Sequence, residues 1–443
     1  MGNWLTGLKS LRRYPSLVAG LVIILAFVVV SIGTMIAMPY GEAIALWRGA
    51  PGIWDENPKT ARPVWFDFFT SDKLSRTIKI ASDDKGAVRV EPLDDNTSLV
   101  TIELPFRYDY DTFPTELNLF TDASADLVIS ILWHTPDGRT VAITDDRSVR
   151  MGQDIYYISQ DNRLWTQLGN PRPHYALLAD PANQAAPLKG VYRLVLTSEV
   201  PTAGQLDVKL VVYGQIHGLA GTDHRRRDLM VALLWGAPIA LVFGVVAAVG
   251  TTLVTFLLAA VGTWLGGKAD KTLQWLTQVN LIIPLLPVLI MVGYLYSRSI
   301  WTMLGLVIAL NILGASMLTN RAMFLQAKES PYIEAAQAYG AGNWRIIFRY
   351  LMPRLAPTLL PHLVLIIPSF VFLEATLAVL GLGDPVLPTW GKVLYDGYGQ
   401  GALYQGMYYW VIEPAVLLML LGVGFSLIGY SLDRVFNPRL RTV

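Results

Sequence analysis

The chain has 443 residues, of which 53% are hydrophobic and 16% charged, and its mean hydropathy is +0.41. This composition excludes an ordinary soluble protein and indicates a membrane protein, because the apolar residues also occur in long uninterrupted runs. The net charge of +1 argues against a nucleic-acid partner, and the lack of cysteine excludes a disulfide framework and a thiolate metal site.

The first long apolar run, Ser16 to Met38, contains no charged residue and follows the basic residues Lys9, Arg12 and Arg13. A run of this length crosses a hydrocarbon core of about 30 Å as a helix. A signal peptide would have a shorter apolar core and a small-residue cleavage site. We therefore expect residues 1–38 to form a cytoplasmic N-terminus and an uncleaved first membrane-spanning helix.

Residues 39–223 are polar and contain short stretches that alternate apolar and polar residues. Stretches 127–132 and 140–144 flank the turn signal Pro136-Asp137-Gly138, which predicts a hairpin. Stretches 191–196 and 206–213 predict a second strand pair. Several short strands with turn signals are typical of a β-sandwich, here of roughly jelly-roll type. We expect an extracytoplasmic domain that is a spacer or cap, or that docks a partner or binds a ligand.

Residues 224–443 carry the other apolar runs. Run 229–265 predicts an interfacial helix followed by a span, and further spans are predicted at 273–296, 300–318, 355–382 and 411–432. Pro284 and Pro287 predict a kink in the first of these. Gly262 to Lys268 imitates a phosphate-binding loop, but Ala269 replaces the required Ser or Thr. The fold class expected is an α-helical membrane protein of about six spans with an inserted β-domain, and the chain is not expected to hydrolyse ATP.

The segment Ser330 to Pro353 predicts two short helices joined by a sharp turn within a loop at 321–354. Ser330 can cap the first helix, and Gly340 can end it in the left-handed conformation. Asn343 can cap the second helix, which Pro353 is expected to stop. Small side chains at Ala335, Ala336 and Ala338 allow another surface to approach closely, and Glu334 can anchor that contact by charge. The segment therefore predicts a docking surface.

Glu334-Ala335-Ala336, followed by Gly340 and closed by Pro353, resembles the EAA loop of bacterial ABC import permeases. In that family the loop is the cytoplasmic coupling helix, which sits in a groove of the ATP-binding subunit. The alternative is an ordinary helix–turn–helix between membrane spans. The resemblance implies an ATPase-coupling site composed of Glu334, Ala335, Ala336, Gly340, Arg345 and Pro353.

A second set of motifs resembles the C-type permease of dipeptide, oligopeptide and nickel importers. These motifs are LEATLAVLGLG at 373–383, PTWG at 388–391, Asp433 with NPRLR at 437–441, and GTD with RD at 221–228. The resemblance covers about half of the chain. The family usually has Gly where Arg226 stands, and often Arg and Asp where Trp275 and Gln278 stand. The β-domain is also far larger than the family's usual loop between the first two spans.

Glu374 is a carboxylate deep inside a predicted span, where a charge normally faces a cavity or a partner. Glu374 could lie near the gate or pathway. Alternatively, it could take part in helix packing or lie at the interface with the partner permease. The predicted pathway or subunit-interface site comprises Glu374, Gly381, Gly383, Trp390 and Gly391. The five histidines show no metal-ligand spacing, so neither a metal nor a cofactor is expected.

Basic residues are distributed unevenly between the predicted loops. The outer loop 384–409 has Lys392 alone, whereas the other side carries Arg321, Lys328, Arg345, Arg349, Arg354, Arg434, Arg439 and Arg441. This asymmetry follows the positive-inside rule and predicts that both termini are cytoplasmic. The expected location is the inner or plasma membrane of a prokaryote, in contact with lipid on many faces.

These features predict a permease subunit of an ATP-driven importer for peptides or a related small solute, forming half of the pathway. The resemblance implies three partners: a B-type permease, ATP-binding subunits and an extracytoplasmic substrate-binding protein. The alternative is a membrane-anchored receptor whose β-domain binds a glycan or peptide. A secondary transporter would need paired intramembrane charges and repeated broken helices, which this sequence does not offer.

Overall fold

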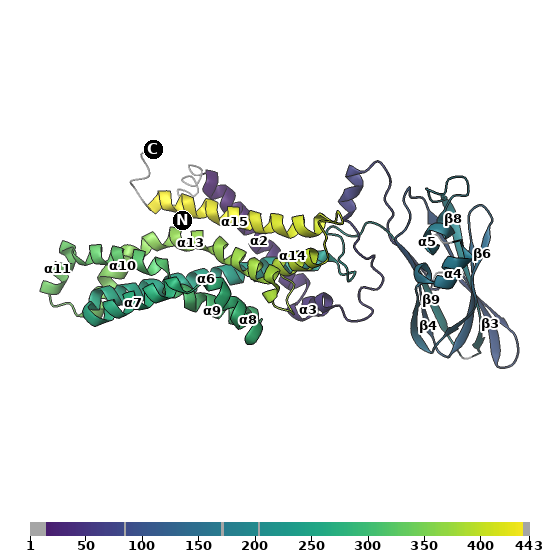
Figure 1. Cartoon of the computed structure of the whole chain (residues 1–443), viewed down its shortest axis with the longest axis horizontal. Coiled ribbons are helices and arrows are strands. Elements are labelled where there is room, and N and C mark those ends of the chain that lie inside the picture. The colour runs from purple at the N-terminus through teal and green to yellow at the C-terminus, as the bar shows by residue number, and fades with distance from the viewer. Residues whose placement is uncertain (1–14, 84–85, 170–171, 203, 437–443) are drawn as a thin grey trace, which may run out of the picture. The chain divides into compact units, whose positions relative to one another are not determined.

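The computed structural model describes residues 15–83, 86–169, 172–202 and 204–436. The chain divides into two compact units, Gly49–Met230 and a helical unit formed by Met1–Arg48 with Val231–Val443 (Figure 1). The sequence placed the boundaries at 39 and 223, whereas α3 (Tyr40–Arg48) falls within the helical unit. Lys9, Arg12, Arg13 and the motif at 437–441 lie outside the described residues.

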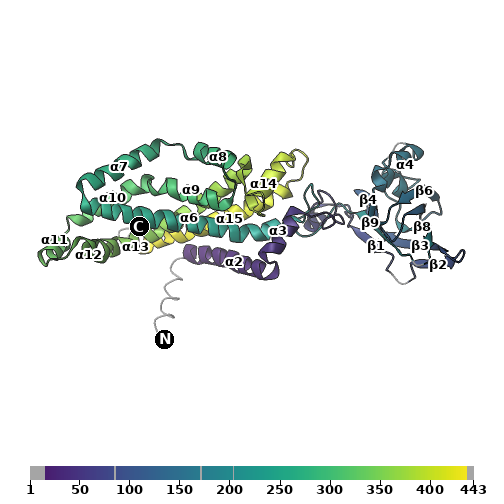
Figure 2. The same cartoon turned by 90° about the horizontal axis from the view of Figure 1, so that it is seen from below.

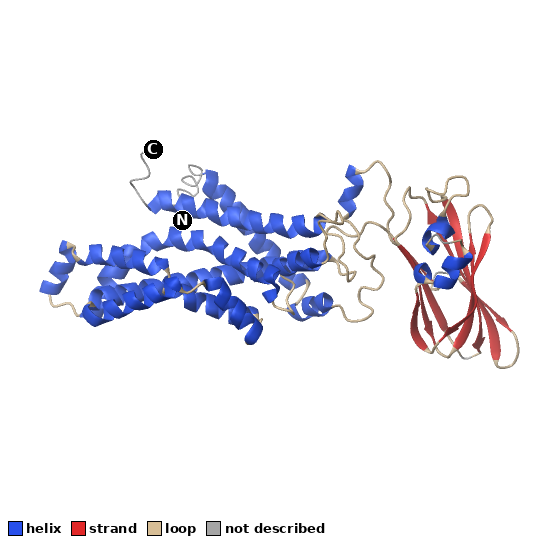
Figure 3. Cartoon of the chain, in the orientation of Figure 1, coloured by secondary structure: helices blue, strands red, loops and turns tan. Residues whose placement is uncertain are grey.

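The strands lie in Gly49–Met230 and the long helices in the other unit (Figure 3). One antiparallel sheet has four strands in the order β1-β9-β4-β7, and the other has five in the order β2-β3-β8-β5-β6. The strands are β1 (Ile78–Ala81), β2 (Val88–Pro92), β3 (Thr97–Tyr108), β4 (Glu116–Ala123), β5 (Leu127–His134), β6 (Thr140–Val149), β7 (Gly152–Tyr156), β8 (Gly190–Pro201) and β9 (Leu206–Tyr213). Short helices in this unit are η1 (Val64–Phe69), η2 (Ile158–Gln160), α4 (Asn162–Gln167) and α5 (Pro173–Leu178).

Strand pairing confirms one prediction and overturns another. The predicted hairpin is β5 with β6, in which Trp133 pairs with Val141 and the Thr135 amide donates to the Arg139 carbonyl at 3.0 Å. The second predicted pair is wrong: β8 pairs with β3 and β5, whereas β9 pairs with β1 and β4 in the other sheet. Alternation of apolar residues indicates which side chains are buried, but not which strand lies alongside.

Both sheets contribute to one hydrophobic core. Ile102, Ile129 and Leu194 come from the five-stranded sheet, and Leu117 and Leu210 from the four-stranded sheet; all are fully buried. Each sheet therefore has one apolar face turned inward, which is the arrangement that the alternating stretches require.

Among the described residues, four helices are long and apolar enough to cross a membrane, or up to six if each bent pair is one span. The four are α2 (Pro15–Ala37), α6 (Leu229–Leu265), the helix Asn343–Leu382 and α15 (Tyr409–Phe436). The bent pairs are α7 (Gly267–Ile282) with α8 (Leu285–Leu295), at 76°, and α9 (Ile300–Ile312) with α10 (Ala315–Lys328), at 42° (Figure 2). Two shorter helices complete the unit: α11 (Pro331–Ala338) and α14 (Trp390–Gly399).

Helix boundaries correct two expectations and confirm a third. Run 229–265 is one helix of 37 residues with Pro238 inside it, not an interfacial helix followed by a span. The kink predicted in 273–296 is confirmed, because the break between α7 and α8 falls at Ile283 and Pro284. The expected span 300–318 is bent between Ile312 and Ala315 and continues to Lys328.

Candidate functional site

The predicted docking segment begins with α11. Ser330 occupies the N-cap position and Pro331 the first turn, although the Ser330 side chain makes no capping hydrogen bond. At the other end Gly340 has φ +78°, and its amide donates to the Gln337 carbonyl at 2.8 Å. The Ala341 amide donates to the Ala336 carbonyl at 3.0 Å, which completes a Schellman motif. The predicted left-handed stop at Gly340 is confirmed.

The second half of the segment differs from the prediction. Gly342, not Asn343, is the N-cap residue, and the Asn343 side-chain oxygen accepts a hydrogen bond from the Trp264 indole at 3.1 Å. Pro353 does not stop a helix either, because the helix Asn343–Leu382 runs through it and is first interrupted at Gly381, where φ is +84°. The π-helical turns of η3 (Ile346–Leu351) end two residues before Pro353, and the Met352 amide donates to the Ile347 carbonyl. This wider turn lets the helix continue past a residue that has no N–H.

Buried side chains hold this segment against the rest of the helical unit. Ile333 is 1% exposed and Ile347 is fully buried, and both pack in one cluster with Phe256 of α6 and Phe324 of α10. The Lys328 ammonium donates to the Thr263 and Trp264 carbonyls at 3.2 Å each, at the last turn of α6. The docking segment is therefore packed against α6 and α10.

The opposite face of the segment is exposed. Tyr339 is 93% exposed, and Trp344 and Phe348, whose rings stack at 5.9 Å, are 61% and 52% exposed. Of the six predicted coupling residues, Ala336 is buried, whereas the exposed ones are Glu334, Ala335, Gly340, Arg345 and Pro353. Trp344 and Phe348 were not among the predicted site residues, although their spacing of four residues is that of one helical face.

The second predicted site lies at the other end of the same continuous helix. Glu374 is 7% exposed, and it lines a cavity of about 10 Å³ with Asp384 and Arg298. Such a volume is close to the smallest that holds one water molecule. Asp384 accepts a hydrogen bond from the Ile300 amide at 3.1 Å, at the start of α9. The Glu374 carboxyl is therefore enclosed by the chain's own helices.

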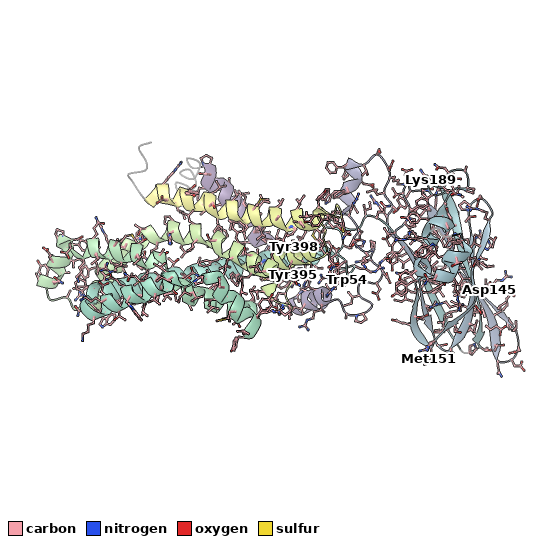
Figure 4. The ribbon with its side chains drawn as sticks, in the orientation of Figure 1. Trp54, Asp145, Met151, Lys189, Tyr395 and Tyr398 are labelled. Atoms are coloured by element: carbon pink, nitrogen blue, oxygen red, sulfur yellow. The ribbon has the colours of Figure 1, made fainter. Side chains whose placement is uncertain are left out.

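The remaining residues of this site form a compact junction. Gly381 has φ +84° within η4 (Ala378–Leu382), and the ring of Tyr395 from α14 lies beside it (Figure 4 labels Tyr395 and Tyr398). Gly383 and Gly391 both lie against Ala378. Trp390 is 1% exposed, and its indole donates to the Leu233 carbonyl of α6 at 2.8 Å. The structure thus brings all five predicted residues into the same part of the helical unit.

The motif at 221–228 forms a tight turn in the Gly49–Met230 unit. Asp223 is fully buried and accepts hydrogen bonds from the Arg227 amide at 2.9 Å and from its guanidinium at 2.6 Å. Arg226 has φ +64°, in the region that favours glycine. Its guanidinium pairs with Glu116, donates to the Asn57 carbonyl at 2.8 Å and stacks over Tyr213. Arginine here ties the turn to the strand domain.

Residues 240–442 match the family model described as binding-protein-dependent transport system inner membrane component. This match covers α7 to α15, both predicted sites and the continuous helix between them. Residues 240–442 are a permease domain of this family. The Gly49–Met230 unit lies outside the match.

Curated relatives agree with this assignment. The chain is 29% identical over 224 residues to the oligopeptide transport system permease protein OppC of Bacillus subtilis, covering 50% of this chain and 72% of that protein. The dipeptide transport system permease protein DppC of the same organism is also 29% identical, over 50% of this chain and 68% of its own. The peptidoglycan transport system permease protein YejE of Agrobacterium fabrum is 28% identical, over 49% of this chain and 56% of its own length.

Proposed function

We propose that this chain is one of two permease subunits of an ATP-driven importer whose cargo is a peptide or a related small solute. The observation that carries the proposal is the exposed face of α11 and the following turn, held by a buried cluster inside a permease domain. A surface with this support can be pushed or pulled by a partner without unfolding. The names of the relatives support the cargo class, since they transport oligopeptides, dipeptides and peptidoglycan.

Coupling would start where ATP-binding subunits hold the exposed residues around Glu334 and Tyr339. Nucleotide binding and hydrolysis on those subunits supply the energy, and this chain contributes no catalytic group. The helix Asn343–Leu382 then carries movement toward Glu374 and Gly381, because 40 residues of helix extend about 60 Å. The α6 and α10 helices follow through the cluster around Ile333 and Phe256.

We infer six spans, counting each bent pair as one, with both termini in the cytoplasm of a prokaryote and the chain in its inner membrane. The Gly49–Met230 unit would then be an extracytoplasmic β-sandwich. Arg225, Arg226 and Arg227 do not oppose this side, since positive charges attached to a long translocated domain have little effect on orientation. The expected partners are a B-type permease, ATP-binding subunits and an extracytoplasmic substrate-binding protein.

The test uses the assembled importer in proteoliposomes. Gly340→Val places a β-branched residue in the left-handed position at a cost of about 1–2 kcal/mol, so transport and its stimulation of ATP hydrolysis should fall. Gly342→Val is the matched control, because Gly342 has φ −68° and open space around its Cα. Glu334→Lys should also uncouple transport while the protein level in the membrane stays normal.

If Gly340→Val and Glu334→Lys together leave transport intact, the coupling assignment is wrong. The cargo is tested separately, by measuring which peptides the cognate substrate-binding protein retains. Failure to bind any peptide would overturn the cargo class and leave the coupling assignment standing.

A further inference from the structure

An aromatic helix in the Gly49–Met230 unit has no role in the function proposed above. The helix η1 has the sequence VWFDFF, and Phe68 and Phe69 are 87% and 79% exposed. Trp65 is 36% exposed, and its ring contacts Phe69 edge to face at 6.2 Å. Leu219, which is 62% exposed, lies beside Trp65. Clusters of large apolar side chains at this level of exposure mark a contact surface.

Hydrogen bonds fasten η1 to the chain that leads into α6. The Val64 amide donates to the Gly218 carbonyl at 2.9 Å, and the Trp65 indole donates to the Leu219 carbonyl at 3.0 Å. The Leu229 amide, at the first residue of α6, donates to the Gly221 carbonyl at 3.1 Å. The aromatic helix is thus held close to the point where the chain becomes an apolar, membrane-length helix.

Its chemistry fits a lipid surface better than a protein groove. Phe68 and Phe69 protrude at the end of η1 as bare rings, and the only charge in the helix is Asp67. The Arg62 guanidinium lies 5.7 Å from the Phe66 ring, and the Arg76 side chain is 60% exposed beside Asp67. Aromatic rings with basic side chains next to them are typical of segments that lie at the boundary between headgroups and acyl chains.

We propose that η1 is a membrane-contact element: Phe68 and Phe69 insert into the acyl boundary of the bilayer, and Arg62 and Arg76 face the lipid phosphates. This contact is separate from ATPase coupling and from the cargo. It would give the Gly49–Met230 unit a second attachment to the membrane besides its covalent links (Figure 1 draws η1 apart from both sheets).

The experiment exploits the lack of cysteine in the chain, which makes single labels free of background. Phe68→Cys and, separately, Phe69→Cys are labelled with a polarity-sensitive fluorophore in the full chain. Each protein is placed in nanodiscs of phosphatidylethanolamine and phosphatidylglycerol, with plain or brominated acyl chains. Met151→Cys is the matched control, since Met151 is 72% exposed in the same unit and far from η1 in sequence (Figure 4).

We expect several-fold stronger quenching by brominated chains at positions 68 and 69 than at 151, with a blue-shifted emission. Arg76→Glu should weaken that quenching by placing a negative charge opposite the anionic phosphatidylglycerol. Equal quenching at 68, 69 and 151 would overturn the proposal. A second result would also overturn it: blue-shifted emission from positions 68 and 69 that appears only when the partner subunits are present and is not quenched by brominated lipid. In that case η1 would contact protein rather than lipid.

Discussion

The two units use the same apolar residues in opposite ways. In Gly49–Met230 the strands bury Ile102, Leu117 and Trp133 completely and carry ion pairs such as Lys79–Glu56 on the surface. In the helical unit, Ile36, Ile282 and Leu295 are each more than 75% exposed. An apolar surface of this kind is stable only where lipid or another subunit replaces water. The solvent, and not the residue type, therefore decides which side of each element turns outward.

The units also differ in how they hold close contacts. The strand domain buries hydrogen-bonded charges, of which Asp223 with Arg227 is the clearest case. The helical unit relies on shape: Gly236 of α6 lies directly against the Trp390 indole, where a Cβ would come within 2.2 Å of the ring. Removing the partner of a buried charge should destabilise the strand domain strongly. Adding side-chain volume should destabilise the helical unit.

The largest effect is expected from Asp223→Ala. Arg227 has only 3% of its side chain exposed, so this change removes the carboxylate that compensates a buried positive charge and should cost about 3–5 kcal/mol. Urea unfolding of a 49–230 fragment, followed by tryptophan fluorescence, measures it. Glu56→Ala is the control: its pairs with Lys79 and Lys209 are part-exposed and should be worth about 1 kcal/mol or less. Equal losses would show that burial of the pair does not matter.

A pH-dependent loss should follow from His174, which is 3% exposed on α5. Burial lowers the pKa of His174 to about 4. An unfolded histidine titrates near pH 6.5, so the unfolded state binds more protons below that pH. Stability should therefore be complete above about pH 6.5 and decrease by roughly 3 kcal/mol as the pH falls toward 4. The His174→Gln variant should lack this part of the pH dependence of the free energy of unfolding. An unchanged pH dependence in that variant would contradict the role given to His174.

A moderate loss is expected when volume is added to the helical unit. Gly236→Ala should destabilise it by about 1–3 kcal/mol, because the new methyl group overlaps the Trp390 ring. Thermal unfolding in nanodiscs measures the change. Gly305→Ala on α9 is the control, since nothing lies within 4 Å of the added Cβ. Trp390→Leu combined with Gly236→Ala should recover part of the loss, and failure to do so would mean that the contact is not the cause.

The smallest effect is expected at Arg226, where the loss of an ion pair and the relief of backbone strain have opposite effects on stability. Arg226→Gly removes the pair with Glu116 but relieves about 1–2 kcal/mol of left-handed strain, so stability should stay within about 1 kcal/mol. Arg226→Ala removes the pair and keeps the strain, so it should be less stable than Arg226→Gly by about 1 kcal/mol. Urea unfolding of both variants ranks them, and the reverse order would refute the strain argument.

Local features of the sequence predicted local structure well. Run 16–38 lies within one residue of α2, the turn at Pro136-Asp137-Gly138 joins β5 to β6, and Gly340 ends α11. Each of these depends on neighbours in the chain: a continuous apolar run, a turn residue between strands, or a residue without a Cβ. Coupling by Glu334 and an outer location for Gly49–Met230 stay predictions.

Contacts between distant residues were beyond reach of the same reasoning. The Asn343 side chain looked like a helix cap, but it accepts the Trp264 indole from a helix almost 80 positions earlier. Ala336 belongs to an apparent small-residue docking face, yet it is buried, with 6% exposed. Composition and hydropathy were sufficient for the membrane class and the strand-rich unit, because burial in lipid or in a sheet leaves a repeating pattern along the chain. The permease motifs were recognised by their resemblance to a known family. Strand partners, the inward side of α11 and the attachment of Arg226 to Glu116 required the tertiary structure, because each depends on side chains that meet only after the chain has folded.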